Sequence, residues 1–221
     1  EIRSFIFFEV FMGFIASIAS LFMFVFIANV VLTKETILTD VFITNIVYSL
    51  RQEWLTKVMF IISLLGSEVI IFGSILIVIF LTIRKHKKET FIFSFLLLMG
   101  LTATTFLKLL YKIPRPELSR LTVETSYSFP SGHALNSFLF YGALSYFVYH
   151  FTKNKAVSAI ITIFFGVEVF LIGLSRVYLG VHHPSDVVAG YIAGFWLLTT
   201  TILVDKTITF FRFIRENSQT S

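Results

Sequence analysis

Cysteine is absent from the 221-residue sequence, and charged residues are scarce at 14%. Without cysteine the chain can form neither a disulfide framework nor a thiolate metal site. Soluble domains carry about 25% charged residues, so the charges here are too few to cover a water-soluble globule of this size. A disordered chain is excluded as well, because hydrophobic residues make up 56% and the mean hydropathy is +0.86. The composition predicts an integral membrane protein, and its 28 phenylalanines suit contact with lipid.

Six apolar stretches are long enough to cross a bilayer, which takes about 20 residues in a helix. They are 10–32, 58–83, 91–111, 134–151, 156–174 and 187–204. Strands of a β-barrel would alternate over about ten residues, whereas these runs are continuous. The predicted fold is therefore all-α, with six transmembrane helices in one bundle. The first stretch is too long for the apolar region of a signal peptide, so we expect it to be retained. We expect residues 1–221 to form one membrane-embedded domain, because no repeat or low-complexity linker divides them.

Basic residues favour one side of the predicted bundle. Ten of the 18 lysines and arginines lie in the two short connections or near the two ends of the chain. Short basic loops mark the cytoplasmic side, so both termini are expected in the cytoplasm and the three longer connections outside a plasma membrane. This asymmetry explains the net charge of +5, and no nucleic-acid partner is expected. The ten residues are Arg3, Arg84, Lys85, Lys87, Lys88, Lys153, Lys155, Lys206, Arg212 and Arg215.

The longer connection 33–57 has two interpretations. Leu38, Val41, Phe42 and Ile46 recur at helical spacing, which is typical of an interfacial helix. An ordinary loop with scattered apolar residues is the alternative.

Polar and small residues elsewhere near the spans have less specific interpretations. Glu68 and Glu168 lie inside predicted spans, where an acid is a functional hypothesis by default; we prefer a buried carboxyl group that joins helices. Gly190 and Gly194 form a G-x-x-x-G pattern, expected to pack helices within the monomer. Lone cations such as Arg120 are expected to be interfacial anchors. The oligomeric state is not predicted.

Three segments expected on the outer side combine cations with a helix start. Lys108 and Arg115 lie at the end of the third span, and Arg176 lies at the end of the fifth. Arginine binds phosphate oxygens through a bidentate fork, while lysine acts as a point charge. Ser131 and Gly132 open the fourth span, where free backbone N–H groups and the helix dipole favour an anion. These residues predict a pocket for a multiply charged oxyanion, most simply a phosphate.

Two histidines add reactivity to this pocket. His182 precedes Asp186 by four residues, so one helical turn would bring them together. A carboxylate that accepts one ring N–H fixes the tautomer and leaves the other nitrogen free to attack. His133 comes from another helix and can protonate a leaving oxygen. No cluster with metal-ligand spacing accompanies them, so neither a catalytic metal nor another cofactor is expected.

The motifs K-x6-R-P, P-S-G-H and S-R-x5-H-x3-D, within residues 108–186, resemble the signature of the type 2 phosphatidic acid phosphatase family. That family shares its site with vanadium-dependent haloperoxidases, and the resemblance implies the same helical core. It implies that His182 forms a phosphohistidine while Asp186 orients it. It also implies that His133 protonates the leaving group and then activates water. The implied phosphate-binding residues are Lys108, Arg115, Ser131, Gly132 and Arg176.

The predicted function is hydrolysis of a lipid phosphate whose tails stay in the bilayer. From the family, the candidate substrates are phosphatidylglycerol phosphate, phosphatidic acid, lysophosphatidic acid and polyprenyl diphosphates. The compact form favours phosphatidylglycerol phosphate or undecaprenyl diphosphate by analogy. A phosphotransferase that uses the same site is one alternative. A non-enzymatic transporter of anionic lipids is another, although it would need the cations and not the His–Asp pair.

Overall fold

The structure is a computed structural model that describes residues 2–117 and 119–218, without the side chains of residues 2–6, 213 and 216–218. The side chain of Arg3, expected on the cytoplasmic side, lies outside this described part. The described chain contains helices and no strand, which confirms the all-α prediction. The helices are α1 (Ile2–Leu32), α2 (Ile37–Ser49), α3 (Glu53–Leu65), α4 (Glu68–Ile83), α5 (Lys87–Tyr111), α6 (Gly132–Thr152), α7 (Lys155–Tyr178) and α8 (Pro184–Ser218).

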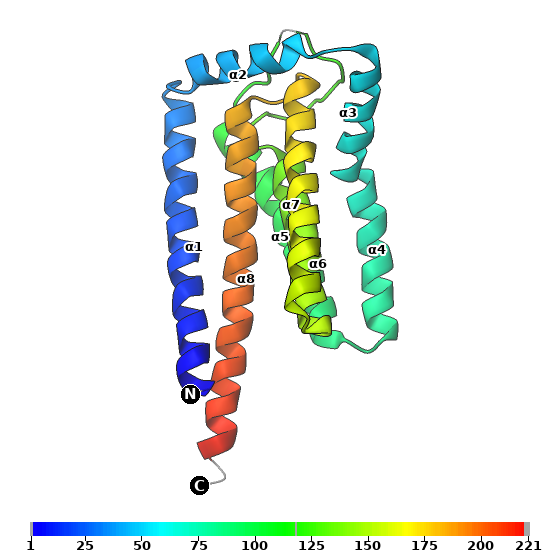
Figure 1. Cartoon of the computed structure of the whole chain (residues 1–221). Coiled ribbons are helices and arrows are strands. Elements are labelled where there is room, and N and C mark those ends of the chain that lie inside the picture. The colour runs from blue at the N-terminus through cyan, green and yellow to red at the C-terminus, as the bar shows by residue number, and fades with distance from the viewer. Residues whose placement is uncertain (1, 118, 219–221) are drawn as a thin grey trace.

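Helix α6 is the hub of the bundle. It packs against α4, α5, α7 and α8, while α1 runs along α8. The two termini lie at one end, and α2 crosses the other end together with the 112–131 connection (Figure 1). We call this second end the site end. Gly190 and Gly194 bring α8 onto α6, because a Cβ at Gly190 would lie 2.6 Å from the Ser131 carbonyl oxygen. This contact confirms the predicted packing within the chain.

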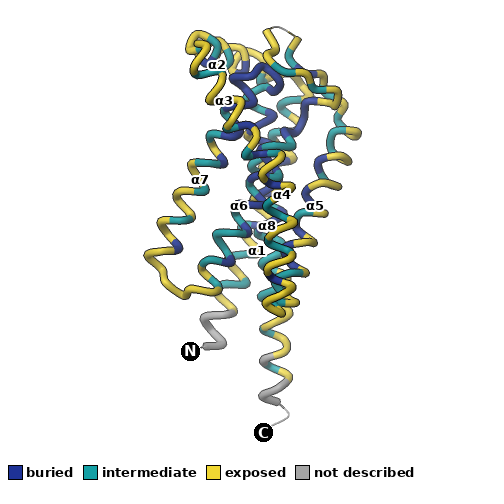
Figure 2. Tube along the Cα trace, turned by 90° about the vertical axis from the view of Figure 1, so that its right-hand side faces the viewer, coloured by how far each residue is buried: buried dark blue, intermediate teal, exposed yellow. Residues whose placement is uncertain are grey.

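Five helical segments are long and apolar enough to cross a membrane: Phe7–Leu32, Glu53–Ile83, Lys87–Tyr111, Lys155–Tyr178 and Pro184–Arg212. They correspond to five of the six expected spans. The remaining expected span is α6. This helix has 21 residues, but it contains polar residues such as Asn136 and Ser137. Exposed residues cover the outer faces of the bundle, and buried residues gather toward the site end (Figure 2). The protein is therefore a multi-pass membrane protein with its most enclosed region at one end.

The expected continuous span 58–83 is wrong in one respect, because it is two helices. Helix α3 ends at Leu65 and α4 begins at Glu68. A Cβ at Gly66 would lie 2.5 Å from Ile172 Cγ2 and 3.2 Å from His133 Cδ2, so the junction passes close to α7 and α6. Uniform hydropathy across residues 58–83 hides this break. The break brings polar residues of the junction to the site end.

The helical interpretation of residues 33–57 is confirmed by α2 and by the first turn of α3. Asp40 of α2 accepts hydrogen bonds from the amide and the hydroxyl of Ser185, at 2.9 and 2.7 Å. Arg51 donates to the carbonyl oxygens of Ser119 and Tyr178, at 2.9 and 3.0 Å. These bonds fix α2 across the site end, over α8, α7 and the 112–131 connection.

Candidate active site

The 112–131 connection turns back over the end of α5 and brings two cations together. Arg115 Nε donates to the Ser126 carbonyl oxygen at 2.7 Å, and Lys108 Nζ donates to the Ser126 hydroxyl at 2.9 Å. Arg115 Nη1 also donates to the carbonyl oxygen of Val181 at 2.8 Å. The guanidinium is thereby oriented by main-chain oxygens from two separate loops. A cavity of about 650 Å³ opens beside Lys108 and Arg115.

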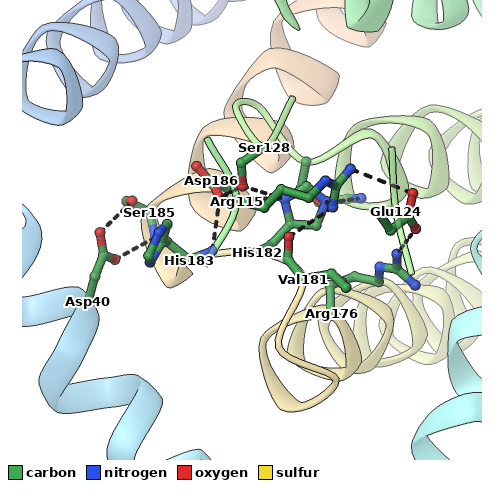
Figure 3. Close-up of polar contacts among 12 residues, drawn as sticks. Asp40, Arg115, Glu124, Ser128, Arg176, Val181, His182, His183, Ser185 and Asp186 are labelled. Carbon is green, nitrogen blue, oxygen red and sulfur yellow. Dashed lines mark hydrogen bonds and ion pairs between the residues drawn. The ribbon is translucent and has the colours of Figure 1, made fainter. Parts of the chain in front are cut away.

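One carboxylate, Glu124, joins the two motif arginines (Figure 3). Its Oε2 lies 3.6 Å from Arg115 Nη2, and its Oε1 accepts a hydrogen bond from Arg176 Nη2. Arg176 is 3% exposed and also donates to Ser63 Oγ, while its Nε is buried without a hydrogen-bond partner in the described part of the chain. Two buried guanidiniums are costly without an anion between them. Glu124 is the carboxylate that compensates both guanidiniums in this structure.

The turn between α7 and α8 places the His–Asp pair. Gly180 adopts φ +80°, a left-handed conformation that glycine takes without strain. Pro184 then starts α8, and Asp186 accepts the His183 N–H at 2.9 Å, as the third residue of a capping box does. A carboxylate in the first turn is also favoured by the helix dipole. Local sequence thus fixes Asp186 one turn after His182.

His182 is enclosed and held in one orientation. It is 2% exposed and Asp186 is 1% exposed, and Nδ1 lies 3.4 Å from Asp186 Oδ2. Arg115 Nη1 lies 3.3 Å from the other ring nitrogen, Nε2. A guanidinium only donates, so Nε2 accepts and the ring proton belongs on Nδ1, facing the carboxylate. Nε2 is the ring nitrogen that carries the lone pair, and this lone pair faces the Arg115 guanidinium.

Burial sets the charge of this imidazole. Removal from water lowers the pKa of His182 to about 4, although the hydrogen bond and the charge of Asp186 act to raise it. The ring is therefore neutral at pH 7, as a nucleophilic nitrogen must be. Motif spacing predicted the pairing but not the degree of enclosure.

Ser128 is a third member of this group. Its hydroxyl donates to Asp186 Oδ2 and lies 3.3 Å from His182 Nδ1, and its side chain is fully buried. Oδ2 of Asp186 thus faces the Ser128 hydroxyl, the His183 amide and the His182 ring. The interpretation of the sequence did not include Ser128, since it precedes the P-S-G-H motif by two residues and carries no spacing signal of its own.

The P-S-G-H segment starts α6 under the His–Asp turn. Ser131 is the N-cap, and its hydroxyl accepts from the Ala134 amide. Its own amide donates to the Asp186 carbonyl oxygen at 3.0 Å, so this N–H is already paired within the chain. The first-turn amides of Gly132 and His133 are the remaining donors. A Cβ at Gly132 would lie 2.9 Å from Thr104 Cγ2, so glycine allows α6 to approach α5 there.

His133, in the first turn of α6, lines a second cavity. That cavity, of about 200 Å³, is also lined by Arg176 and Glu124. The structure thus gathers all eight residues that the sequence singled out at the site end. It corrects the interpretation of Arg120, which is no lone anchor: it donates to the carbonyl oxygens of Arg115 and Pro116. Residues 2–117 and 119–218 contain no group of three His, Cys, Asp or Glu side chains that could hold a metal ion.

Fold and site together define an all-helical, multi-pass membrane protein with a cationic, histidine-containing cluster at one end. Residues 89–209 match the PAP2 superfamily. The chain is 32% identical to phosphatidylglycerophosphatase B of Bacillus subtilis (strain 168) over 197 residues, which is 87% of this chain and 97% of that protein. The chain therefore belongs to the PAP2 superfamily, which confirms the resemblance carried by the three motifs.

Solved structures agree with this assignment. The crystal structure of a transmembrane PAP2-type phosphatidylglycerolphosphate phosphatase from Bacillus subtilis superposes with a TM-score of 0.81 at 28% identity, covering 87% of this chain and 96% of that one. LpxE of Aquifex aeolicus shares the fold, with a TM-score of 0.59 and 24% identity over 73% of this chain and 93% of its own.

A second relative by sequence matches a shorter part of the chain. An undecaprenyl-diphosphatase of Sulfolobus acidocaldarius is 34% identical over 89 residues, 38% of this chain and 36% of that protein.

Proposed function

We propose that this protein is a lipid phosphate phosphatase that needs no metal ion and acts through a phosphohistidine at His182. The observation that carries the proposal is the orientation of this imidazole: Nδ1 faces Asp186, and Nε2 faces the Arg115 guanidinium. An anion-binding transporter would need the arginines but not a buried, neutral histidine held by a carboxylate. The names of the two curated relatives indicate lipid monophosphates and diphosphates as substrate classes.

In the first step, His182 Nε2 attacks phosphorus, and the bond from phosphorus to the leaving oxygen breaks. His133 donates a proton to that oxygen, so the lipid alcohol leaves neutral. The Asp186 carboxylate stabilises the positive charge that develops on the His182 ring. In the second step His133 takes a proton from water, the water oxygen attacks phosphorus, and the P–N bond breaks to release phosphate.

Charge stabilisation supplies most of the catalysis in this scheme. Phosphoryl transfer spreads negative charge over three equatorial oxygens, and preorganised donors stabilise it. Lys108, Arg115, Arg176 and the amides of Gly132 and His133 are the donors we assign. The carboxylate of Glu124 leaves the arginines when phosphate enters, because both anions need the same guanidiniums.

We place the site on the extracytoplasmic face of the plasma membrane, with both termini in the cytoplasm. Support comes from the short connections at the termini end, which are rich in lysine and arginine, and from the distance along the bundle between the termini and α2 (Figure 1). The substrate's tails stay in lipid and its phosphate reaches the site end between helices.

Phosphate release by the purified chain in detergent tests the proposal. We expect release from a dioleoyl phosphatidic acid or phosphatidylglycerol phosphate micelle, in EDTA, with loss of activity in His182→Ala and His133→Ala. Activity that disappears in EDTA and returns with Mg²⁺ would contradict the metal-independent scheme. Phosphate found on an added alcohol instead of in solution would identify a phosphotransferase.

A further inference from the structure

The cavity of about 200 Å³ beside His133 lies at the break between α3 and α4. Ser63 and Phe60 line it from α3, Ser67 and Glu68 line it from the junction and the start of α4, and Thr122 lines it from the 112–131 connection. A single water needs about 10–15 Å³ of such space, so this cavity holds several water-sized groups. It is therefore large enough for a small polar fragment but not for a lipid tail.

The cavity adjoins the residue that we assign as the acid for the leaving group. In an in-line displacement the leaving oxygen is opposite the attacking nitrogen, and His182 Nε2 approaches from the Arg115 side. His133, which we assign as the acid, lines this cavity together with Arg176. The larger cavity beside Lys108 and Arg115 is not lined by His133. Of these two cavities, the smaller one is the one that gives a leaving alcohol access to His133.

The lining has a defined chemical character. Ser63 Oγ accepts from Arg176, so its hydroxyl hydrogen is available to another acceptor. Ser67 Oγ donates toward Glu68 and the Ser63 carbonyl oxygen, so its lone pairs can accept from a substrate hydroxyl. The Glu68 carboxylate adds a further acceptor and a negative charge; it is exposed, so the expectation of a buried carboxyl group at this position is wrong. Phe60 and Leu64, at 39% and 46% exposure, lie on the same rim and face outward on the bundle.

We propose that this cavity binds the leaving alcohol and selects an uncharged, hydroxyl-bearing group, such as glycerol, over a second phosphate attached to the leaving oxygen. Glu68 is the specificity-determining residue, because its carboxylate accepts from a hydroxyl and repels a phosphate. The exposed rim formed by Phe60 and Leu64 lets the rest of the lipid pass into the bilayer. The inference rests on the proposed function, since it assumes the in-line reaction at His182. It predicts the order phosphatidylglycerol phosphate, then phosphatidic acid, then a prenyl diphosphate.

The test is a comparison of kcat/KM for dioleoyl phosphatidylglycerol phosphate, dioleoyl phosphatidic acid and farnesyl diphosphate in the same detergent micelles. The wild type is compared with Glu68→Gln and Thr122→Val. Glu53→Gln is the matched control, because Glu53 is an exposed acid on the same helical pair and lies outside the cavity. Ratios between substrates on one preparation cancel any difference in the fraction of folded enzyme.

We expect Glu68→Gln to raise kcat/KM for the diphosphate about tenfold relative to phosphatidylglycerol phosphate, since like-charge repulsion is removed. Thr122→Val should reduce the advantage of phosphatidylglycerol phosphate over phosphatidic acid about threefold, the effect of one hydrogen bond. Unchanged ratios in both variants, an equal change in Glu53→Gln, or a wild-type preference for the diphosphate would overturn the inference while leaving the phosphatase intact. No phosphate release from any of the three lipids by the wild type would overturn the proposed function instead.

Discussion

The two histidines of the site are held in opposite ways. His182 is almost completely buried, and both of its ring nitrogens face named partners: Ser128 and Asp186 on one side, Arg115 on the other. His133 is half-buried, lines an open cavity, and its ring makes no hydrogen bond among the described residues. The difference corresponds to their proposed tasks. A nucleophile gains from a fixed tautomer, whereas an acid that later acts as a base must meet a leaving oxygen and then a water molecule.

The largest expected effects concern His182, the histidine that is held in place by its partners. His182→Ala should lower kcat by about 10⁴-fold or more, and Asp186→Asn should lower it by about 10⁴-fold because the wrong tautomer is stabilised. Phosphate release from a lipid phosphate micelle measures both. His183→Gln is the control, since the His183 ring is part of neither the His182–Asp186 contact nor the His182–Arg115 contact. Activity of Asp186→Asn within tenfold of the wild type would show that the carboxylate does not set the tautomer.

Arg115 is expected to come next in magnitude. Arg115→Ala removes a donor that faces both Glu124 and His182, and kcat should fall about 10²- to 10³-fold, as on removal of one oxyanion-hole donor. Arg115→Lys should recover only part of this loss, because lysine lacks the bidentate fork. Arg120→Lys serves as the comparison, because the hydrogen bonds of Arg120 among the described residues go to main-chain oxygens. Full activity in Arg115→Lys would mean that charge alone is needed.

Ser128→Ala tests how far the His182–Asp186 pair depends on a residue outside the three motifs. Asp186 loses one of its donors, so kcat should fall about tenfold while KM changes little. Ser137→Ala is the matched control, as Ser137 is equally buried and bonds within α6. Equal losses of activity in the two variants would reduce the role of Ser128 to packing.

Enclosure of His182 also predicts how stability changes with pH. The folded-state pKa of about 4 lies below the unfolded value near 6.5, so the unfolded chain binds more protons between these limits. The contribution of the neutral, buried His182 ring to the free energy of unfolding is complete above about pH 6.5 and is lost as pH falls through about 4. Thermal unfolding in detergent should show a smaller drop in midpoint between pH 7 and pH 4 for His182→Gln than for the wild type. Equal drops would place the ring in contact with water.

The smallest expected effect concerns Glu124. If its carboxylate competes with oxyanions for the arginines, Glu124→Gln should tighten inhibition by orthovanadate about threefold. The exposed Glu117 of the same connection supplies the control, Glu117→Gln. Weaker inhibition in Glu124→Gln would show that the carboxylate builds the site and does not occupy it.

Spacing in the sequence predicted the contact between His182 and Asp186 better than it predicted the surroundings of that pair. Asp186 lies one helical turn after His182, so local geometry was enough to relate them, and Lys108 and Arg176 lie in the last turns of α5 and α7. Ser128 and Glu124 lie in an irregular connection, where the position of a side chain depends on tertiary packing that no spacing encodes. The use of the Ser131 amide by Asp186 depends on the same packing.

In the fold, too, some features could be predicted from the local sequence and others depend on tertiary packing. Continuous hydropathy predicted the spans and the all-helical class, because lipid demands satisfied backbone groups over the length of a bilayer. The α3–α4 break at Gly66 follows instead from the close approach of Ile172 and His133, which is a property of three helices together. Gly-Ser-Glu at residues 66–68 is the one local signal for it, since serine before glutamate is typical of a helix start.

The stereochemical course at phosphorus tests the central claim most directly. Each in-line displacement inverts the phosphoryl group, so attack by His182 followed by attack of an acceptor oxygen gives overall retention. A chiral, isotopically labelled phosphomonoester transferred to an alcohol acceptor reports this outcome. Retention, lost together with turnover in His182→Ala, is the result we predict. Inversion would mean a single displacement with no phosphohistidine, and would contradict the account.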